Sequence, residues 1–278
     1  MHLNVEIKGQ GFPILCLHGH PGSSRTMSVF TDSLSQHFQT IAPDLRGYGN
    51  SRCQGEFEME DHLDDIEQLL DRLQIDRCLI LGWSLGGILA IELALRAAQR
   101  YTGLILIATA ARPWSDHPKI NAIDLLYTGI AGIVNWIVPG WQWNIDTFGR
   151  RSLFRYLLGQ QVPSAYRYIA SDAVTAYLQT SKFAQQALDR AMARGYSRIS
   201  DLALIQNPCL VLAGERDRHI NVQSSRETAQ HLPNCCWHSY ANVAHLFPWE
   251  IPQTVLQDIK GWLEAYPEVV ARTSANWH

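Results

Sequence analysis

The sequence has little charge, and that charge is not clustered. Only 18% of the 278 residues are charged, the formal net charge is -3, and no run of Lys or Arg is longer than two. Nucleic-acid binding depends on clustered cations that neutralise phosphates, so the composition argues against a nucleic-acid partner. Hydrophobic residues make up 46% of the chain, which is enough for a sizeable core in a soluble globular protein.

Targeting, metal-binding and cofactor-binding patterns are also missing. The N-terminus has no basic segment followed by an apolar one, so we expect no secretory signal. The six cysteines form no C-x-x-C pair, and Cys16, Cys78 and Cys209 lie in apolar, strand-like runs. This usage predicts no metal site and a reducing, cytoplasmic location. The segment Gly9-Gln10-Gly11 lacks the third glycine of a dinucleotide-binding motif and precedes a strand rather than a helix, so no cofactor is expected.

Charge is absent altogether between Leu125 and Trp143. This stretch is long enough to suggest a membrane-spanning helix. Pro139, two polar side chains and three glycines make it a poor composition for one buried helix, so a span is disfavoured. We expect instead an apolar lid that could contact lipid or a second subunit. The oligomeric state stays open.

Short apolar runs alternate with longer segments of helical periodicity along most of the chain. Such alternation is typical of a mostly parallel central sheet flanked by helices, an α/β fold. Apolar residues at positions 63, 66, 70 and 73 share one helix face, as do those at 251, 255, 259 and 262. The predicted strands are Leu3–Lys8, Ile14–Leu17, Thr40–Ala42, Cys78–Leu81, Leu104–Ala108, Cys209–Ala213 and Cys236–Tyr240.

The alternation stops after residue 108 and resumes only at residue 209. The residues between lack strand-like runs and are rich in Trp and Tyr. We therefore predict a core domain formed by residues 1–111 and 201–278, with residues 112–200 inserted as a helical cap.

The segment Gly82-Trp83-Ser84-Leu85-Gly86 matches the pattern G-x-S-x-G. It follows a predicted strand and precedes a helix that is apolar nearly all round, which is the context of a nucleophile elbow. In such an elbow the serine lies on a strained turn, and the flanking glycines prevent backbone clashes. Ser84 is therefore the predicted nucleophile.

A serine hydroxyl needs a base to accept its proton, and the base needs an acid to orient it. Asp217 follows one predicted strand and His245 follows the next, so both belong to the edge where open α/β sheets place ligands. We predict Asp217 as the acid and His245 as the base, with Glu215 as the fallback acid.

The turn after the strand Ile14–Leu17 reads His18-Gly19-His20-Pro21-Gly22. We expect the backbone N–H of His20 and that of Leu85 to stabilise a developing oxyanion. His18 is expected to brace the loop. Whether the ring of His20 lines the pocket stays open.

These motifs together resemble the α/β-hydrolase superfamily, and the resemblance includes Pro43–Ser51 and the stretch from Leu246 to Pro252, with Glu250. The Gly-Trp-Ser-Leu-Gly-Gly segment is similar to that of carboxylesterases, methyl ester esterases, enol lactonases and C–C bond hydrolases. Haloalkane dehalogenases and epoxide hydrolases also resemble the chain but have Asp at the position of Ser84.

The resemblance implies acyl transfer to water from a small-molecule substrate. The leading expectation is a serine esterase for a small to medium apolar ester, with Trp83, Trp136 and Trp141 lining the pocket. The alternatives are cleavage of a C–C bond in a vinylogous diketone, lactone hydrolysis, and a non-catalytic ligand receptor built on the same fold.

Overall fold

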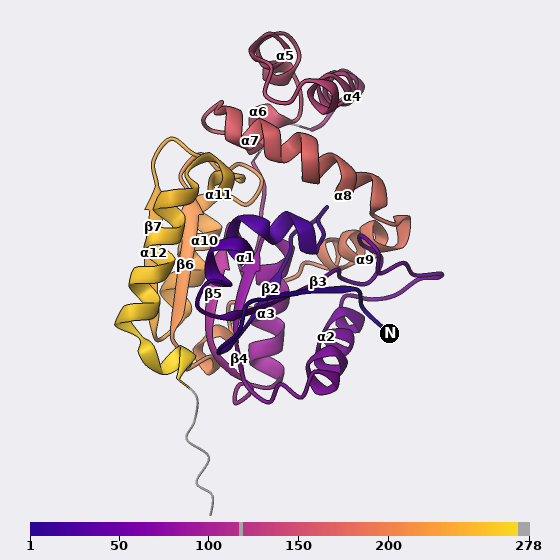
Figure 1. Cartoon of the computed structure of the whole chain (residues 1–278). Coiled ribbons are helices and arrows are strands. Elements are labelled where there is room, and N and C mark those ends of the chain that lie inside the picture. Colours follow the sequence, from indigo (N-terminus) through magenta and orange to yellow (C-terminus); the bar gives the residue numbers. More distant parts are fainter. Residues whose placement is uncertain (117–118, 272–278) are drawn as a thin grey trace, which may run out of the picture.

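The computed structural model describes residues 1–116 and 119–271. Their strands form one seven-stranded sheet with the order β1-β3-β2-β4-β5-β6-β7, parallel except for β1, which pairs antiparallel with β3 (Figure 1). All seven predicted strands are present, with ends that differ by three residues or fewer. Their bounds are β1 Val5–Lys8, β2 Pro13–Leu17, β3 Gln39–Pro43, β4 Cys78–Trp83, β5 Tyr101–Ile107, β6 Cys209–Gly214 and β7 Cys235–Tyr240.

Helices cover both faces of this sheet, and the described regular elements between β5 and β6 are helices. The core helices are α1 Ser28–Leu34, α2 Glu60–Arg72, α3 Leu85–Arg96, α10 Val222–His231, α11 Phe247–Glu250 and α12 Pro252–Ala265. The helices between β5 and β6 are α4 Ala122–Ile137, α5 Gln142–Thr147, α6 Phe154–Leu157, α7 Pro163–Tyr168, α8 Val174–Gln179 and α9 Lys182–Ala193.

The strand sequences are apolar on both faces because both faces are covered. Successive side chains of a strand point to opposite sides of the sheet. In β4, Cys78 and Ile80 therefore belong to the core under α2 and α3, whereas Leu79 and Leu81 belong to the core under α1 and α12. This two-sided burial explains why the runs read as continuous hydrophobic segments.

Each flanking helix buries the face that its periodicity predicts. In α2, Leu63, Ile66 and Leu70 are buried, while acidic residues fill its exposed side. Helix α12 begins at Pro252, which suits the first turn of a helix, and it buries Val255 and Ile259. Helix α3 is buried on nearly all sides, as expected for the helix that follows the central strand.

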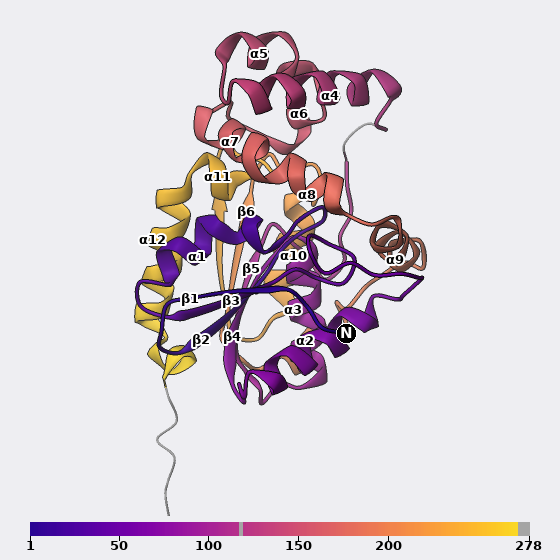
Figure 2. The same ribbon diagram turned by 45° about the vertical axis from the view of Figure 1, so that its right-hand side comes forward.

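We refer to residues 112–200 as the cap. In both views its helices lie beyond the carboxyl ends of the parallel strands, with α4 and α5 farthest from the sheet and α7 and α8 nearer to it (Figures 1 and 2). The described part of the cap contains helices and no strand. Within the described residues, no helix combines the length and the apolar character that crossing a membrane requires.

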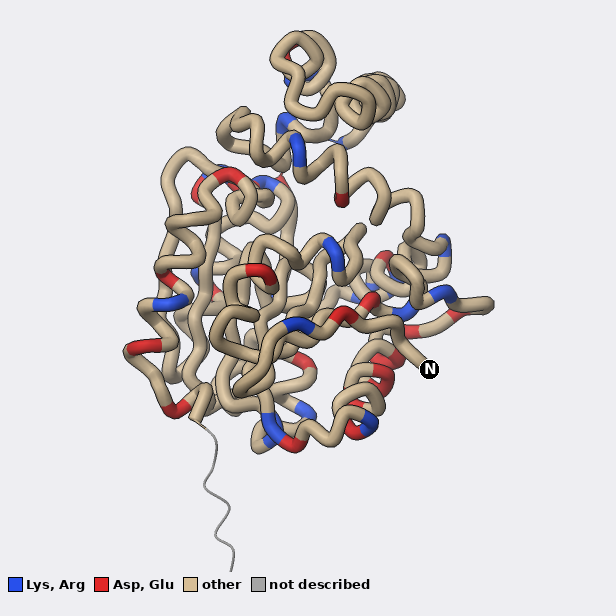
Figure 3. Tube along the Cα trace, in the orientation of Figure 1, with Lys and Arg blue, Asp and Glu red and all other residues tan. Residues whose placement is uncertain are grey.

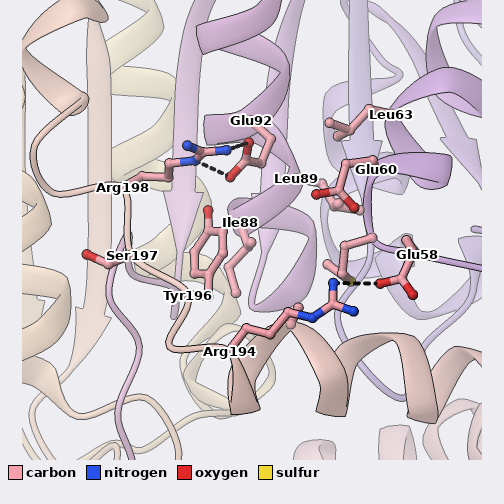
Figure 4. A pocket seen from close by; sticks show the side chains of 12 residues that line it. Glu58, Glu60, Leu63, Ile88, Leu89, Glu92, Arg194, Tyr196, Ser197 and Arg198 are labelled. Carbon is pink, nitrogen blue, oxygen red and sulfur yellow. Dashed lines mark hydrogen bonds and ion pairs between the residues drawn. The ribbon is translucent and has the colours of Figure 1, made fainter.

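Ion pairs attach the last part of the cap to the core. Arg198 forms two hydrogen bonds with the carboxylate of Glu92 in α3, at 2.8 and 3.0 Å. Glu58, just before α2, accepts hydrogen bonds from Arg190 and Arg194, both at 3.1 Å. Figure 4 shows most of these side chains around a cavity of about 210 Å³ between α2, α3 and α9. Two of its acidic groups, Glu58 and Glu92, pair with arginines across it, so the cavity lies where the cap is attached to the core.

Candidate active site

Ser84 lies on a sharp turn between β4 and α3. Its φ of +53° is unusual for a residue with a side chain, so the turn is strained. A Cβ at position 82 would lie 2.3 Å from the carbonyl oxygen of Gly86, and a Cβ at position 86 would lie 2.1 Å from that of Leu17. The two glycines of the motif are therefore required by backbone contacts on both sides of the serine.

The side chains of Ser84, His245 and Asp217 form one chain of hydrogen bonds. The Ser84 hydroxyl donates to Nε2 of His245 over 3.1 Å, and Nδ1–H of His245 donates to Oδ2 of Asp217 over 2.8 Å. All three side chains are nearly excluded from solvent. Residues predicted from three separate loops are thus brought into direct contact, although Ser84 and His245 are 161 positions apart.

The other oxygen of Asp217 is held by the backbone. Its Oδ1 accepts the N–H groups of His219 and Ile220, each at 2.9 Å. These bonds fix the carboxylate plane, so Oδ2 points at the imidazole. Glu215, the fallback acid, is exposed and accepts a hydrogen bond from Ser239 instead.

The loop after β2 packs directly against Ser84. A Cβ at Gly19 would lie 3.0 Å from Cβ of Ser84 and 2.8 Å from the ring of Trp83, so only glycine allows this approach. Leu85 is the first residue of α3, and its N–H therefore has no partner inside the helix. Among the described residues, no backbone bond is donated by the His20 N–H. His20 thus follows the glycine that packs against Ser84, and Leu85 follows Ser84 itself.

The two histidines of this loop have different partners. Nδ1–H of His18 donates to the Gly19 carbonyl over 2.8 Å, and its Nε2 accepts the N–H of Leu45 over 3.1 Å. Burial lowers the pKa of His18 to about 4, so the ring is neutral and braces the loop, as expected. The ring of His20 lies between the Tyr48 hydroxyl, at 2.8 Å, and the side-chain oxygen of Gln185 in α9, at 2.6 Å. Burial also lowers the pKa of His20.

Of the aromatic residues that surround the base, the sequence singled out only Trp83. Trp83 lies 5.6 Å from the His245 ring, packs edge-to-face against Trp249 at 4.7 Å, and Trp249 stacks on Tyr168 of the cap at 4.0 Å. The stack links the elbow to α7. No local signal could have found Tyr168, because its partner lies 81 positions away in the chain.

Glu250 connects the histidine loop to the cap. One carboxylate oxygen accepts the N–H of Ala244, next to His245, over 3.0 Å, and the other accepts the N–H of Gln160 over 2.5 Å. Burial raises the pKa of this carboxyl. The sequence marked Glu250 only through the family resemblance, and its contacts give it a positioning role.

The three tryptophans expected to line the pocket lie in different parts of the structure. Trp83 is buried beside His245, but Trp136 and Trp141 are 72% and 45% exposed. They lie at the end of α4 and just before α5, on the side of the cap away from the sheet (Figure 2). The structure therefore does not bring them together with Ser84.

The carboxyl edge of the sheet offers a second cavity, of about 360 Å³, beside Asp217. Arg155, Arg216 and Arg218 line it together with Asp116 and Glu215. No group of three or more His, Cys, Asp or Glu side chains in the described ranges is arranged to hold a metal ion.

Comparison with known proteins agrees with this fold. The family described as alpha/beta hydrolase fold matches residues 13–252. The chain is 27% identical over 252 residues to 2-hydroxymuconate semialdehyde hydrolase of Pseudomonas putida, covering 87% of this chain and 83% of that protein. It is 35% identical over 121 residues to pimeloyl-(acyl-carrier protein) methyl ester esterase of Vibrio campbellii, covering 41% of this chain and 45% of that protein, so this match spans less than half of either chain. Among solved structures, a thermophilic esterase from Thermogutta terrifontis superposes with a TM-score of 0.71 and 26% identity, covering 97% of this chain and 94% of that one.

Proposed function

Since the chain belongs to the α/β-hydrolase family, we propose that it is a serine hydrolase that cleaves a carboxylic ester through an acyl-enzyme. One observation carries the proposal: Oγ of Ser84 is 3.1 Å from Nε2 of His245, whose Nδ1 is 2.8 Å from Asp217. A nucleophile, its base and an orienting acid within hydrogen-bond reach are the arrangement that acyl transfer needs.

In the first half of the proposed reaction, Oγ of Ser84 attacks the ester carbonyl carbon while its proton passes to Nε2 of His245. The negative charge that develops on the carbonyl oxygen is stabilised by the N–H groups of His20 and Leu85. Asp217 holds the imidazole in the tautomer that can accept this proton and stabilises the imidazolium. Nε2–H then protonates the departing alcohol, and the acyl group stays on Ser84.

In the second half, a water molecule takes the place of the alcohol. His245 removes a proton from this water as it attacks the acyl carbon, and returns the proton to Oγ of Ser84 when the acyl bond breaks. The products are a carboxylic acid and the free enzyme. Apart from the ester and this water, both halves use only groups of the chain.

The surroundings of Ser84 favour an apolar acyl group. Trp83, Leu246 and Trp249 of the core share one hydrophobic cluster with Tyr168 and Ile169 of the cap. Ligand sites are typically lined by such side chains, with a few polar groups that orient the reacting bond. We propose a small to medium apolar ester as the substrate. The six free cysteines support a reducing, cytoplasmic location.

The test compares the wild-type protein with Ser84→Ala on a panel of nitrophenyl esters and lactones. We expect turnover and stoichiometric labelling by a fluorophosphonate in the wild type, and neither in the variant. His245→Ala should be about as damaging, because the residues act as a unit. Labelling that survives in Ser84→Ala would place the nucleophile elsewhere. An absence of turnover in the wild type on every substrate class would favour the ligand-receptor alternative.

A second candidate function is cleavage of a carbon–carbon bond in a vinylogous diketone. The similarity to 2-hydroxymuconate semialdehyde hydrolase over 87% of the chain favours it specifically. Ser84, His245 and Asp217 would act in both reactions, so these residues do not distinguish one reaction from the other. Purified protein that hydrolyses dienoic keto acids but not nitrophenyl esters would select this candidate over the esterase.

A further inference from the structure

Helix α4 turns apolar residues toward solvent, which is unusual for a helix of a water-soluble protein. Leu126, Ile133 and Ile137 lie on one face and are 61%, 64% and 67% exposed. The opposite face is buried, and it contains Asp124 and Asn135. A surface helix normally turns its apolar stripe inward and its polar side chains outward.

Polar contacts hold the helix in this orientation. Asp124 forms a capping box with Asn121 and an ion pair with Arg155 at 2.7 Å. The amide of Asn135 donates to the Tyr166 carbonyl over 2.6 Å, and its oxygen accepts the N–H of Gly140 over 2.8 Å. Rotating α4 to bury its apolar face would break the ion pair of Asp124 with Arg155 and the bond of Asn135 to Tyr166, which join the helix to other segments. These contacts therefore fix the apolar face of α4 toward solvent.

This face is the centre of a larger apolar surface, which we call the α4 patch. The patch contains ten of the fifteen large hydrophobic residues that are exposed in the described chain, and soluble proteins rarely group so many. In both views it lies at the end of the molecule farthest from the sheet, so it protrudes (Figures 1 and 2). Its members are Ile120, Ile123, Leu125, Leu126, Ile133, Trp136, Ile137, Val138, Trp141 and Trp143.

Cations surround the patch, and their charge is not cancelled. Residues 112–200 contain ten of the 23 Lys and Arg but only five of the 26 Asp and Glu. Between residues 119 and 168 the two carboxylates, Asp124 and Asp146, are both paired with arginines. Lys119, Arg151 and Arg167 form no ion pair within the described ranges.

Two of these cations belong to segments that contact α4 or the turn after it. Arg167 lies beside Gly140, in the turn between α4 and Trp141, and the turn Gly149–Arg151 packs against α4. Figure 3 shows that the chain trace of this part of the cap has few charged positions. An apolar centre with a basic border complements an anionic bilayer, whose acyl region accepts apolar side chains and whose headgroups attract cations. Three tryptophans add the side chain that is enriched at membrane–water interfaces.

We propose that the α4 patch is a docking surface for an anionic phospholipid bilayer, with α4 lying along the membrane surface. The carboxyl edge of the sheet, where the candidate active site lies, is at the same end of the molecule as the cap. Docking would therefore turn this site toward the lipid. The proposal concerns binding only and does not depend on the reaction that Ser84 performs.

The test is co-sedimentation of the full chain with vesicles of phosphatidylcholine, with and without about one third phosphatidylglycerol. We expect binding to the anionic vesicles, weakened by salt. The variant Leu126→Gln/Ile133→Gln/Ile137→Gln keeps good helix formers at exposed positions, and it should lower the partition coefficient at least about tenfold. Arg151→Gln and Arg167→Gln should each lower it about fivefold on anionic vesicles only.

Leu204→Gln is the matched control, because Leu204 is 71% exposed but lies outside the cap. It should bind vesicles like the wild type, and so should Ser84→Ala. Circular dichroism and nitrophenyl ester hydrolysis check the fold of the triple variant. If that variant does not fold, quenching of wild-type tryptophan fluorescence by brominated phospholipid replaces it.

Three results would overturn the proposal. The first is a wild type that binds neither kind of vesicle, and the second is a folded triple variant that binds as well as the wild type. The third is a wild type that does not bind vesicles and is a dimer in light scattering, whereas the triple variant is a monomer. That result would assign the patch to a second copy of the chain.

Discussion

Single residues of the site are defined by what their backbone and side chains contact. Gly82 and Gly86 leave room for the carbonyl groups that approach the elbow, and the strained Ser84 is held between them. Asp217 is restrained through both oxygens, one by backbone N–H groups and the other by His245. The chemistry of the site therefore depends on a few exact contacts, which substitutions can test one at a time.

Replacing the acid should disable the base without disturbing the fold. In Asp217→Asn an amide faces Nδ1 of His245, so the imidazole loses its preferred tautomer and its charged support. We expect kcat to fall by about three to four orders of magnitude, with an unchanged circular dichroism spectrum. Glu215→Gln is the control, because that side chain is exposed and bonds Ser239. A larger loss in Glu215→Gln than in Asp217→Asn would refute the assignment.

The role of His20 can be divided between its backbone and its ring. If the N–H alone stabilises the oxyanion, His20→Ala keeps that donor and loses only the bonds to Tyr48 and Gln185. We expect kcat to stay within about tenfold of the wild type, whereas loss of an oxyanion donor costs about a hundredfold or more. Steady-state kinetics on one nitrophenyl ester measures this. A hundredfold loss would show that the ring takes part in the reaction.

At the scale of elements, the cap contacts the core through several residues that lie around the candidate active site. Gln185 of α9 bonds His20, Tyr168 of α7 stacks on Trp249, and the N–H of Gln160 bonds Glu250. The helices nearest the sheet therefore contact the residues that surround Ser84, whereas α4 and α5 lie beyond them (Figure 2). This division separates the proposed pocket from the outer surface of the cap.

An acyl-chain series tests which part of the cap selects the substrate. If the cluster around Ser84 forms an apolar pocket, each added methylene contributes about 0.8 kcal/mol, or roughly fourfold in kcat/KM, until the pocket is full. We expect this rise with nitrophenyl esters of increasing acyl length. The slope and the cutoff should be unchanged in Trp136→Ala and Trp141→Ala, because these side chains lie on the outer face.

Tyr168→Ala is the contrasting variant in this series, since its ring stacks on Trp249 in the inner cluster. Its cutoff should move toward longer acyl chains. A series that stays flat in the wild type would argue against an apolar acyl pocket, and a cutoff that moves in Trp136→Ala would return that residue to the pocket wall.

For the whole molecule, the stability of the fold should depend on pH through buried histidines. His62 is buried between Tyr48 and Phe57, and neither of its ring nitrogens has a hydrogen-bond partner among the described residues. Burial, with a smaller contribution from the nearby His18, lowers the pKa of His62 from 6.5 to about 3. Between these values the unfolded chain binds a proton that the folded chain does not, so stability is lost as the pH falls through 6.5.

Urea denaturation at pH 7 and pH 5 measures this loss. One such histidine accounts for about 2 kcal/mol of the difference between the two pH values. His62→Phe has no titrating group and removes two unpartnered nitrogens from an aromatic environment. The variant should therefore lose about that much of the pH dependence and be at least as stable at pH 7. An unchanged pH dependence in His62→Phe would show that His62 is already protonated in the folded protein.

The sequence by itself determined the features that arise from neighbouring residues. Seven apolar runs predicted seven strands, and the apolar helix after Ser84 begins at Leu85 as expected. Strand alternation, glycine spacing around Ser84 and helix periodicity are local properties, because they follow from backbone geometry over a few residues. The order of the strands along the chain also predicted that Ser84, Asp217 and His245 belong to one edge of the sheet.

Only the tertiary structure decided which side chains meet. The bonds of Glu250 to Ala244 and Gln160, the stack from Trp83 to Tyr168, and the exposure of Asp217 relative to Glu215 depend on packing between distant segments. The cap makes the difference clearest. Its aromatic composition predicted an apolar surface, but a pattern along one helix cannot specify whether the core, the solvent or another body covers that surface. The bonds of Asp124 to Arg155 and of Asn135 to Tyr166 hold the polar face of α4 against the rest of the cap, because buried polar groups need partners, and Trp136 is exposed.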